Sequence, residues 1–449
     1  MKFALLKEKI TPDIPVFQAG FGARTHKSEG VHDDPYASIV LISANKTAVI
    51  IALDVVDGDR SFAFGIKNAI EEKYGLKQDE IIINYSHTHS VVAVTGEDKE
   101  KRSQDPYSIN IDKISWSKDK NDIDFTEDVR YFNMIKTKIM NMLDVGFKNL
   151  IDGDAYICKG RSKFGVSRRF PSEFGILWKP NFDENAMDAD LYLIKFIDKN
   201  DNVRGLIYNY ACHPSTLGED NYMISADYPG VVRKHLERQN PGMAAVFLQG
   251  CGGDIKPFIT AYNGQFKSCD YDELEKAGIC LADEIQALIG KPGWRKIDAE
   301  IQTKYSEIKL YSEIWDKEKW ETIINNPDEP AYKKEFVKKL LLDMEEGKIK
   351  NYFPYYISLL RLDKKTCIIG LECEVVSEIG KKVKKVLGDE DVIVLGYSNS
   401  STCYIPTKRV LQDGGYESES LISARLTGPF VHEVEDILIG RVVTLVKLE

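Results

Sequence analysis

A chain of 449 residues is too long for one simple hydrophobic core, which predicts either two lobes or one large elaborated domain. Its composition, 43% hydrophobic and 29% charged, excludes a disordered or fibrous protein. Its net charge of −10 argues against a nucleic-acid partner, because phosphate binding needs clustered lysines and arginines.

The N-terminal part of the chain alternates predicted strands and helices. Residues 37–43 and 47–54 are apolar runs on either side of a short polar turn, which predicts a hairpin. A helix is expected over about 60–74, with Gly75 as its C-cap. The β-branched run at 81–85 then predicts a buried strand.

The rest of the chain continues this alternation after residues 97–126, which are polar, lack periodicity and predict a long surface loop or flap. The further elements expected are a helix near 127–149, a hairpin of 190–198 with 203–211, a helix near 229–238, a strand at 243–250, helices near 315–325 and 331–346, a hairpin of 355–362 with 366–372, a strand at 392–397 and a helix over about 430–447. The mixture of hairpins and strand–helix units predicts an α/β fold of layered mixed β-sheets flanked by helices.

The N-terminus and the cysteines bear on the cellular compartment. Residues 1–17 lack the apolar run and the small-residue cleavage site of a signal peptide, and no stretch is apolar for long enough to span a bilayer. The eight cysteines include no CxxC pair, so free thiols are expected. We therefore expect a cytoplasmic protein without a transmembrane segment.

Candidate metal ligands stand where four predicted strands end. The residues at these ends are His87 and His89, His213, Glu374 and Tyr404. The chain has only seven histidines, and loops that leave a rigid sheet tend to carry functional groups. Neutral imidazole is also the commonest nitrogen ligand of zinc.

Each of these residues also has a purely structural interpretation. In an extended segment His87 and His89 would face the same side and converge on one ion or substrate, whereas otherwise they only cap a strand end. Glu374 lies among apolar residues and therefore needs a partner, either a metal or an arginine such as Arg168. Asp54 and Asp227 would be acceptors that orient ligating histidines, or helix-cap and turn residues.

Short blocks in a fixed order carry a resemblance to a known family. The blocks are Ala19-Gly20-Phe21-Gly22-Ala23-Arg24, Ser86-His87-Thr88-His89-Ser90, Cys212-His213-Pro214, Ser225-Ala226-Asp227-Tyr228-Pro229-Gly230, Gly252-Gly253-Asp254-Ile255-Lys256-Pro257, Cys373-Glu374, Tyr404-Ile405-Pro406-Thr407 and Tyr416-Glu417. In this order and spacing they resemble the catalytic domain of the neutral/alkaline ceramidase family of zinc-dependent amide hydrolases, from about residue 10 to about residue 420.

The resemblance implies a fold, a cofactor and a set of metal ligands. The fold would be that of a ceramidase-like catalytic domain, and the cofactor would be Zn²⁺. The zinc ion would be held by His87, His213, Glu374 and Tyr404. Such an ion lowers the pKa of its bound water and polarises a carbonyl.

The resemblance also implies roles for residues around the ion. His89 would accept the proton of the attacking water and return it to the leaving amine. Tyr416 would polarise the scissile carbonyl, and Arg168 would contact the substrate, with Arg169 the less favoured register. Asp254 would belong to the substrate-binding residues.

The sequence departs from the family pattern at Lys256, at Gln249-Gly250-Cys251-Gly252 and at the end of the chain. Lys256 stands where the family has a serine, and a lysine cannot replace a hydroxyl in that geometry. We interpret Lys256 as a substrate-binding residue for an anionic group such as a carboxylate, the alternative being a surface or salt-bridged lysine. The chain also stops soon after Tyr416, so we expect one catalytic domain over residues 1–449, in one or two lobes, without a C-terminal immunoglobulin-like domain.

These observations predict a zinc-dependent hydrolase that cleaves an N-acyl amide bond in a small-molecule or lipid-like substrate. One alternative is an ester hydrolase that uses the same zinc site. A second is a catalytically inactive binding protein on this fold. A third is a hydrolase with Cys251 as nucleophile, although residues 250–254 do not match the G-x-S-x-G elbow.

Overall fold

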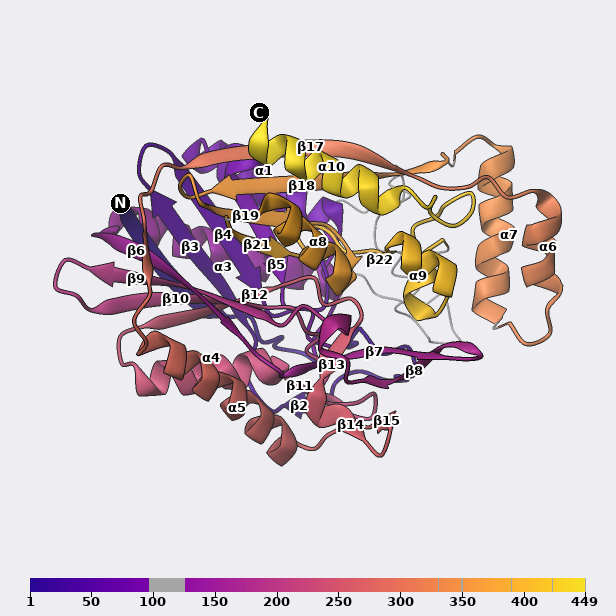
Figure 1. Ribbon diagram of the computed structural model, residues 1–449, viewed down its shortest axis with the longest axis horizontal. Helices are drawn as coiled ribbons and strands as arrows, with labels where there is room; N and C mark the ends of the chain where they lie inside the picture. Colours follow the sequence, from indigo (N-terminus) through magenta and orange to yellow (C-terminus); the bar gives the residue numbers. More distant parts are fainter. Residues whose placement is uncertain (97–125, 330, 349, 389, 422, 449) are drawn as a thin grey trace.

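Two β-sheets lie face to face in this protein, and helices cover their outer faces (Figure 1). The computed structural model describes residues 1–96, 126–329, 331–348, 350–388, 390–421 and 423–448. The arrangement confirms the predicted α/β fold of layered mixed sheets flanked by helices. The predicted loop at 97–126 lies outside the described residues, apart from Thr126, which begins a helix.

The larger sheet has nine strands in the described part of the chain. In spatial order they are β12 (Ala244–Gln249), β10 (Val203–Tyr210), β9 (Asp190–Asp198), β6 (Ile151–Arg161), β1 (Lys2–Lys9), β3 (Tyr36–Ser43), β4 (Thr47–Leu53) and β5 (Ile81–Tyr85), while β16 (Arg295–Ile297) pairs with β6. The pairs β4–β5 and β10–β12 are parallel and the other neighbours are antiparallel, so the sheet is mixed.

A smaller sheet and several short pairings complete the β-structure of the described residues. The smaller sheet runs β17 (Gln302–Tyr311), β18 (Tyr352–Arg361), β19 (Thr366–Leu371) and β21 (Asp391–Leu395). The short pairings are β13 (Ile255–Pro257) with β7 (Gly165–Ser172) and β8 (Gly175–Asn181), β20 (Glu374–Val375) with β22 (Tyr404–Ile405), β11 (Met223–Ile224) with β2 (Gly30–Val31), and β14 (Ala261–Tyr262) with β15 (Gln265–Phe266).

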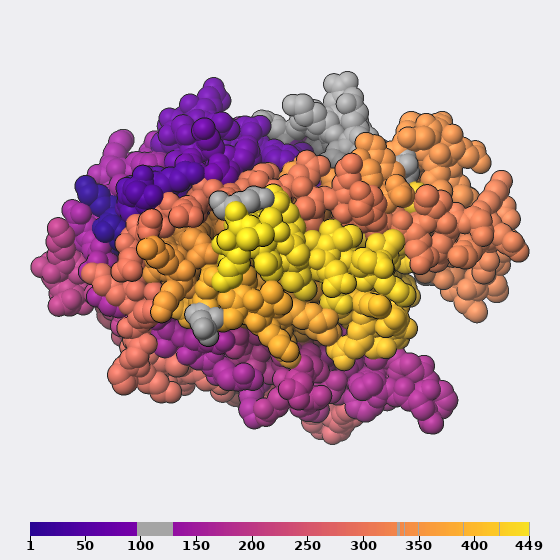
Figure 2. Space-filling view, turned by 45° about the horizontal axis from the view of Figure 1, so that its top comes forward, coloured from indigo at the N-terminus to yellow at the C-terminus, as the bar shows by residue number. Residues whose placement is uncertain are grey.

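Helices lie on both sides of the paired sheets (Figure 1). The α-helices of the described residues are α1 (Arg60–Tyr74), α3 (Thr126–Lys148), α4 (Asp227–Gln239), α5 (Tyr271–Ile289), α6 (Lys317–Asn325), α7 (Ala331–Glu345), α8 (Ser377–Leu387), α9 (Lys408–Asp413) and α10 (Val434–Lys447). None of them combines the length and the apolarity that crossing a membrane requires. The pair α6 and α7 projects from one end of the molecule (Figure 2).

Strand periodicity produces the layers. Along β3, Ile39 and Leu41 pack against α1 and α3, while Val40 and Ile42 point the other way, toward the smaller sheet. The smaller sheet repeats this pattern, because Ile368 in β19 faces the larger sheet and its neighbours face α8 and α10. Strands covered on both faces read as continuous apolar runs, which is why they stand out in the sequence.

The predicted elements are present with shifts of a few residues at their ends. The first helix is confirmed over 60–74, and Gly75 ends it with a left-handed φ of 72°. Several elements were not predicted. They include β1, the strands β6 to β8, the helix α5, the strand β17 and the helices α8 and α9.

Candidate metal centre and catalytic cavity

Asn84 joins three strand ends beneath the site. Its side-chain oxygen accepts from the backbone N–H of Gln249 at 2.7 Å, and its amide donates to the backbone oxygens of Gln249 at 3.3 Å and Gly396 at 2.8 Å. These bonds tie β5 to the ends of β12 and β21. The loops that leave the three strands therefore start from one place.

The loop after β5 turns sharply at its first histidine. His87 has a left-handed φ of 65°, which is a strained conformation for a residue with a Cβ. The segment 87–89 is therefore not extended at its first residue, so the condition under which its two side chains would share one face is not met. The two rings still meet, with 4.9 Å between the ring centroids of His87 and His89, because the backbone N–H of His89 binds the carbonyl of Pro214 at 3.1 Å.

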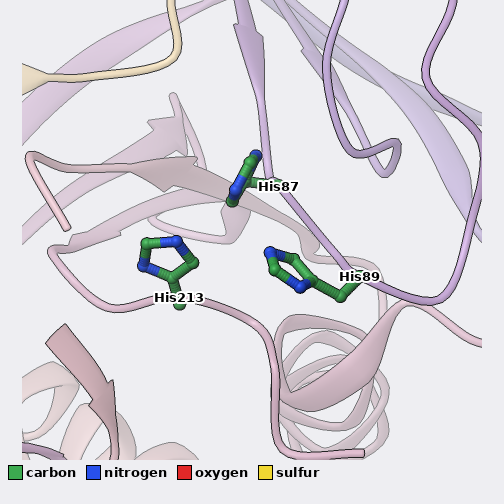
Figure 3. A group of neighbouring side chains, drawn as sticks. All are labelled: His87, His89 and His213. Carbon is green, nitrogen blue, oxygen red and sulfur yellow. The ribbon is translucent and has the colours of Figure 1, made fainter. Parts of the chain in front are cut away.

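Three imidazoles gather at this point. His87 and His89 follow β5, and His213 follows β10. Ligand atoms of the three side chains all lie within 4.8 Å of one another, and the rings converge on a common space (Figure 3). Such a group can hold a metal ion.

Backbone carbonyls fix the direction of two of these rings. The Nδ1 atom of His87 lies 2.9 Å from the carbonyl oxygen of Val56 and 3.0 Å from Oδ1 of Asp57. The Nδ1 atom of His213 lies 2.6 Å from the carbonyl oxygen of Gly252. A carbonyl oxygen only accepts, so both Nδ1 atoms donate, and each ring keeps Nε2 for the centre of the cluster.

Glu374 places one carboxylate oxygen between these two Nε2 atoms. Its Oε2 lies 3.2 Å from Nε2 of His87 and 3.1 Å from Nε2 of His213. The hydroxyl of Tyr397 donates to the same oxygen at 3.4 Å. Two imidazoles and one carboxylate therefore face a single point.

The two imidazoles that face Glu374 have their pKa values shifted in opposite directions. Burial lowers the pKa of His87, but Asp57 and Glu374 outweigh it and raise that pKa to about 10. Burial and the cation of Arg168 lower the pKa of His213 to about 4. Burial raises the pKa of Glu374, but the neighbouring His87 and His213 hold it well below its usual range.

His89 has ring nitrogens without a hydrogen-bond partner among the described residues, although both are buried. Its ring packs edge-on against Phe21 at 4.7 Å, and Arg24 holds its backbone carbonyl at 2.5 Å. Burial, together with His87 and His213, keeps the pKa of His89 well below its usual range, so the ring is neutral. Buried nitrogens left unpaired are costly unless a bound group satisfies them.

The donor set fits a metal ion. His87, His213 and Glu374 supply nitrogen and oxygen donors that zinc accepts, and the unpaired nitrogens of His89 lie within reach. Tyr404 stands beside them because the parallel pair β20–β22 sets it opposite Glu374. The separate roles of Tyr404 as a ligand and of His89 as a base stay predictions.

A cationic wall closes another side of the cavity. Nε of Arg168 donates to Glu417 at 2.7 Å, and Nη2 of Arg168 donates to the hydroxyl of Tyr404 at 3.1 Å. The guanidinium also lies 4.3 Å from the ring centroid of Trp178. Arg169 binds Glu417 from the other side at 2.6 Å, so of the two arginines it is Arg168 that lines the cavity.

The cavity has a volume of about 520 Å³. Its lining consists of Ala19, Gly20, Phe21, Gly22, Val56, Asp57, His87, His89, Ala93, Arg168, Trp178, Ser215, Lys256, Glu374, Ser401, Thr402, Tyr404, Tyr416 and Ser423. Tyr416 is 57% exposed and stands at the mouth. Asp254 is not among the lining residues, because its carboxylate accepts from the backbone and hydroxyl of Ser377, and its substrate contact stays a prediction.

Two solved structures share this architecture. No family model matches the sequence. A neutral ceramidase from Pseudomonas aeruginosa superposes with a TM-score of 0.74 at 16% identity, over 99% of this chain and 74% of the ceramidase chain. A ceramidase complexed with C2 gives a TM-score of 0.73 at 14% identity, over the same shares of the two chains. The chain has the neutral ceramidase fold.

Within this ceramidase fold, three residues have structural rather than chemical roles. Asp54 forms an ion pair with Arg233 at 2.7 Å, and Asp227 accepts from the hydroxyl of Thr216 at 2.7 Å. Neither carboxylate orients a histidine, because Asp54 is also bound by the backbone N–H of Tyr36 and Asp227 by the backbone N–H groups of Thr216 and Leu217. Cys251 is 1% exposed, does not line the cavity and has its thiol pKa raised by burial, which argues against a nucleophile.

The site also includes residues to which the sequence analysis gave no role. Asp57, Trp178 and Ser215 line the cavity, while Tyr397 and Glu417 bind the lining residues Glu374 and Arg168. Asp57 and Glu417 had a signal, since each lies one to three residues from a feature that was recognised, the end of an apolar strand or a tyrosine block. The other three had none, because only the folded chain brings them to the cavity.

Proposed function

We propose that this protein is a zinc-dependent hydrolase that cleaves an N-acyl amide bond. The observation that carries the proposal is the cluster of His87, His213 and Glu374 beside the unpaired nitrogens of His89 at the wall of one cavity. The shared fold of two ceramidase structures supports it.

The ligands of the ion would be His87, His213, Glu374 and Tyr404. A zinc ion held there supplies a Lewis acid that activates water and polarises a carbonyl. Val56 and Gly252 accept from Nδ1 of the two imidazoles, so Nε2 of each is left to face the ion. Binding of the ion would release the Nε2 proton that His87 carries without it.

His89 would move the proton. A neutral imidazole with unpaired nitrogens can accept a proton from the attacking water, and the buried ring returns it readily because its pKa is low. The proton then goes to the nitrogen of the leaving amine. Arg24 and Pro214 hold the backbone of His89 on both sides, which fixes the ring for this transfer.

Arg168 and Tyr416 would bind the substrate carbonyl oxygen. Arg168 keeps donors beyond those that Glu417 and Tyr404 use, and Glu417 holds the guanidinium in place. The acyl chain would lie against the aromatic rings of Phe21 and Trp178, which also line the cavity. These features favour a lipid-like N-acyl substrate.

Metal content and hydrolysis of a matched amide and ester test the proposal. We expect about one zinc ion per purified chain, turnover of the amide, and loss of both in His87→Ala. The exposed His432→Ala is the control and is expected to retain both. Turnover of the ester alone would favour the esterase alternative. Full amide hydrolysis by His87→Ala, or none by a zinc-loaded wild-type chain, would refute the proposal.

A further inference from the structure

Lys256 brings a buried ammonium group into the cavity. It lies on β13, which pairs with β7, the strand of Arg168. Its Nζ donates to Oγ of Ser215 at 3.1 Å and to the carbonyl oxygen of Ser215 at 3.4 Å. Both residues line the cavity next to His89.

No carboxylate of the described residues forms an ion pair with Lys256. Two other buried cations have such partners, since Lys384 pairs with Asp188 at 2.7 Å and Arg233 pairs with Asp54, whereas Lys67 has no ion-pair partner among the described residues. Burial of an uncompensated charge is costly, and the usual compensation is an anion. Lys256 differs from Lys67 in that it opens onto the cavity, where an anionic group of a bound ligand can supply the compensation.

The surrounding wall adds to the positive charge. Arg168 and Arg169 share the single carboxylate of Glu417. Asp254, the other acid near this wall, directs its carboxylate to Ser377 instead. With Lys256 the wall carries a net positive charge, while the carboxylates of Asp57 and Glu374 face the histidines.

We propose that Lys256 and Ser215 bind a carboxylate of the substrate, and that the preferred substrates are N-acyl amino acids. This inference rests on the proposed function and adds the substrate class to it. In an N-acyl amino acid one carbon separates the carboxylate from the scissile amide nitrogen. The carboxylate site and His89 are correspondingly close together, because the backbone N–H of His89 binds the carbonyl of Pro214, and Pro214 directly precedes Ser215.

The donors also favour a carboxylate over a phosphate. One ammonium and one hydroxyl suit a monoanion, whereas phosphate groups are typically bound by forked arginine contacts. Arg168 already gives Nε to Glu417 and Nη2 to Tyr404, so its remaining donors are left for the single oxygen of the substrate carbonyl. When the carboxylate is bound at Lys256, the acyl chain would lie against the aromatic residues near Trp178 at the cavity mouth.

The test compares N-dodecanoylglycine with N-dodecanoylethanolamine, which carries a hydroxyl in place of the carboxylate. We expect kcat/KM of the wild-type chain to be about 10- to 100-fold higher for N-dodecanoylglycine, the factor that a charged hydrogen bond provides. Lys256→Met should lose that factor for N-dodecanoylglycine, so that the preference for N-dodecanoylglycine over N-dodecanoylethanolamine disappears. Lys67→Met, which removes another buried lysine away from the cavity, is the matched control and should keep the preference.

Equal kcat/KM for the two amides, or an equal loss of both in Lys256→Met, would overturn the carboxylate site and leave the proposed function standing. Calorimetric titration of chelator-treated protein with N-dodecanoylglycine tests the carboxylate site independently of hydrolysis. If neither amide is hydrolysed, the proposed function fails, and weaker binding by Lys256→Met than by Lys67→Met still supports the carboxylate site. Equal binding by the two variants would overturn it.

Discussion

At the scale of single residues, the three histidines differ in what holds them. His87 and His213 each give Nδ1 to a backbone carbonyl and turn Nε2 toward Glu374. His89 is held through its backbone, and its ring nitrogens have no partner among the described residues. This difference supports two ligands and one base, because a ligand needs a fixed tautomer and a base needs a nitrogen that is open to substrate.

Lys67 carries a stability prediction at the same scale. It is fully buried, its Nζ donates to the carbonyl of Gln78 at 3.4 Å and lies 4.8 Å from the ring centroid of Tyr305, and burial lowers its pKa from 10.5 to about 7. Between these two pKa values the unfolded chain binds a proton that the folded chain releases, so the free energy of unfolding rises with pH. Lys67→Met should therefore stabilise the protein by about 1–3 kcal/mol near pH 7.

Urea unfolding of the wild-type chain and of Lys67→Met at several pH values measures this effect. The gain from the substitution should shrink as the pH rises from about 7 toward 10.5. A gain that does not change with pH would mean that Lys67 is not the group that titrates.

The sequence predicted the identity of the candidate ligands but not the backbone conformation that brings them together. His87, His213, Glu374 and Tyr404 stand in short motifs at strand ends and were found there. The bend at His87 was missed, because a left-handed φ in a residue with a Cβ is imposed by contacts from distant segments, such as its backbone bond to Val55. No local pattern encodes such contacts.

At the scale of elements, Asn84 is the joint between β5, β12 and β21. Asn84→Ala would leave backbone groups of Gln249 and Gly396 unpaired in a buried place. We expect a fall of about 2 kcal/mol or more in the free energy of unfolding. Weaker metal binding should accompany it, since the loop of His87 starts at this joint.

Denaturant unfolding and competition with a metal chelator measure the two effects of Asn84→Ala. The exposed Asn200→Ala, in the turn between β9 and β10, is a control that should change neither strongly. Wild-type stability in Asn84→Ala would contradict the role of Asn84 as a joint.

The elements that were predicted share a local signal, and those that were missed differ in their reasons. Strands β3 and β4 are continuous apolar runs, which is the pattern of burial on both faces. Strand β7 lacks that pattern because Arg168 and Arg169 lie on it and are buried by ion pairs with Glu417. The helix α5 did have a signal, a capping box of Asp270 with Glu273, that was overlooked.

At the scale of the whole molecule, the fold is shared with ceramidases at 14% to 16% identity. Such a fold can keep a metal cluster while the residues that meet the substrate change. Lys256 is the cationic residue of this cavity wall without an ion-pair partner among the described residues, and it carries the inference about the substrate class. The single catalytic domain and the cytoplasmic location stay predictions.

Anomalous diffraction at the zinc absorption edge, from crystals grown with zinc, tests the central claim most directly. The account predicts one strong peak bonded to His87, His213, Glu374 and Tyr404, with His89 close by but not bonded. A peak bonded to His89 in place of Tyr404 would contradict the division between ligands and base. Absence of any peak among these residues would contradict the metal centre itself.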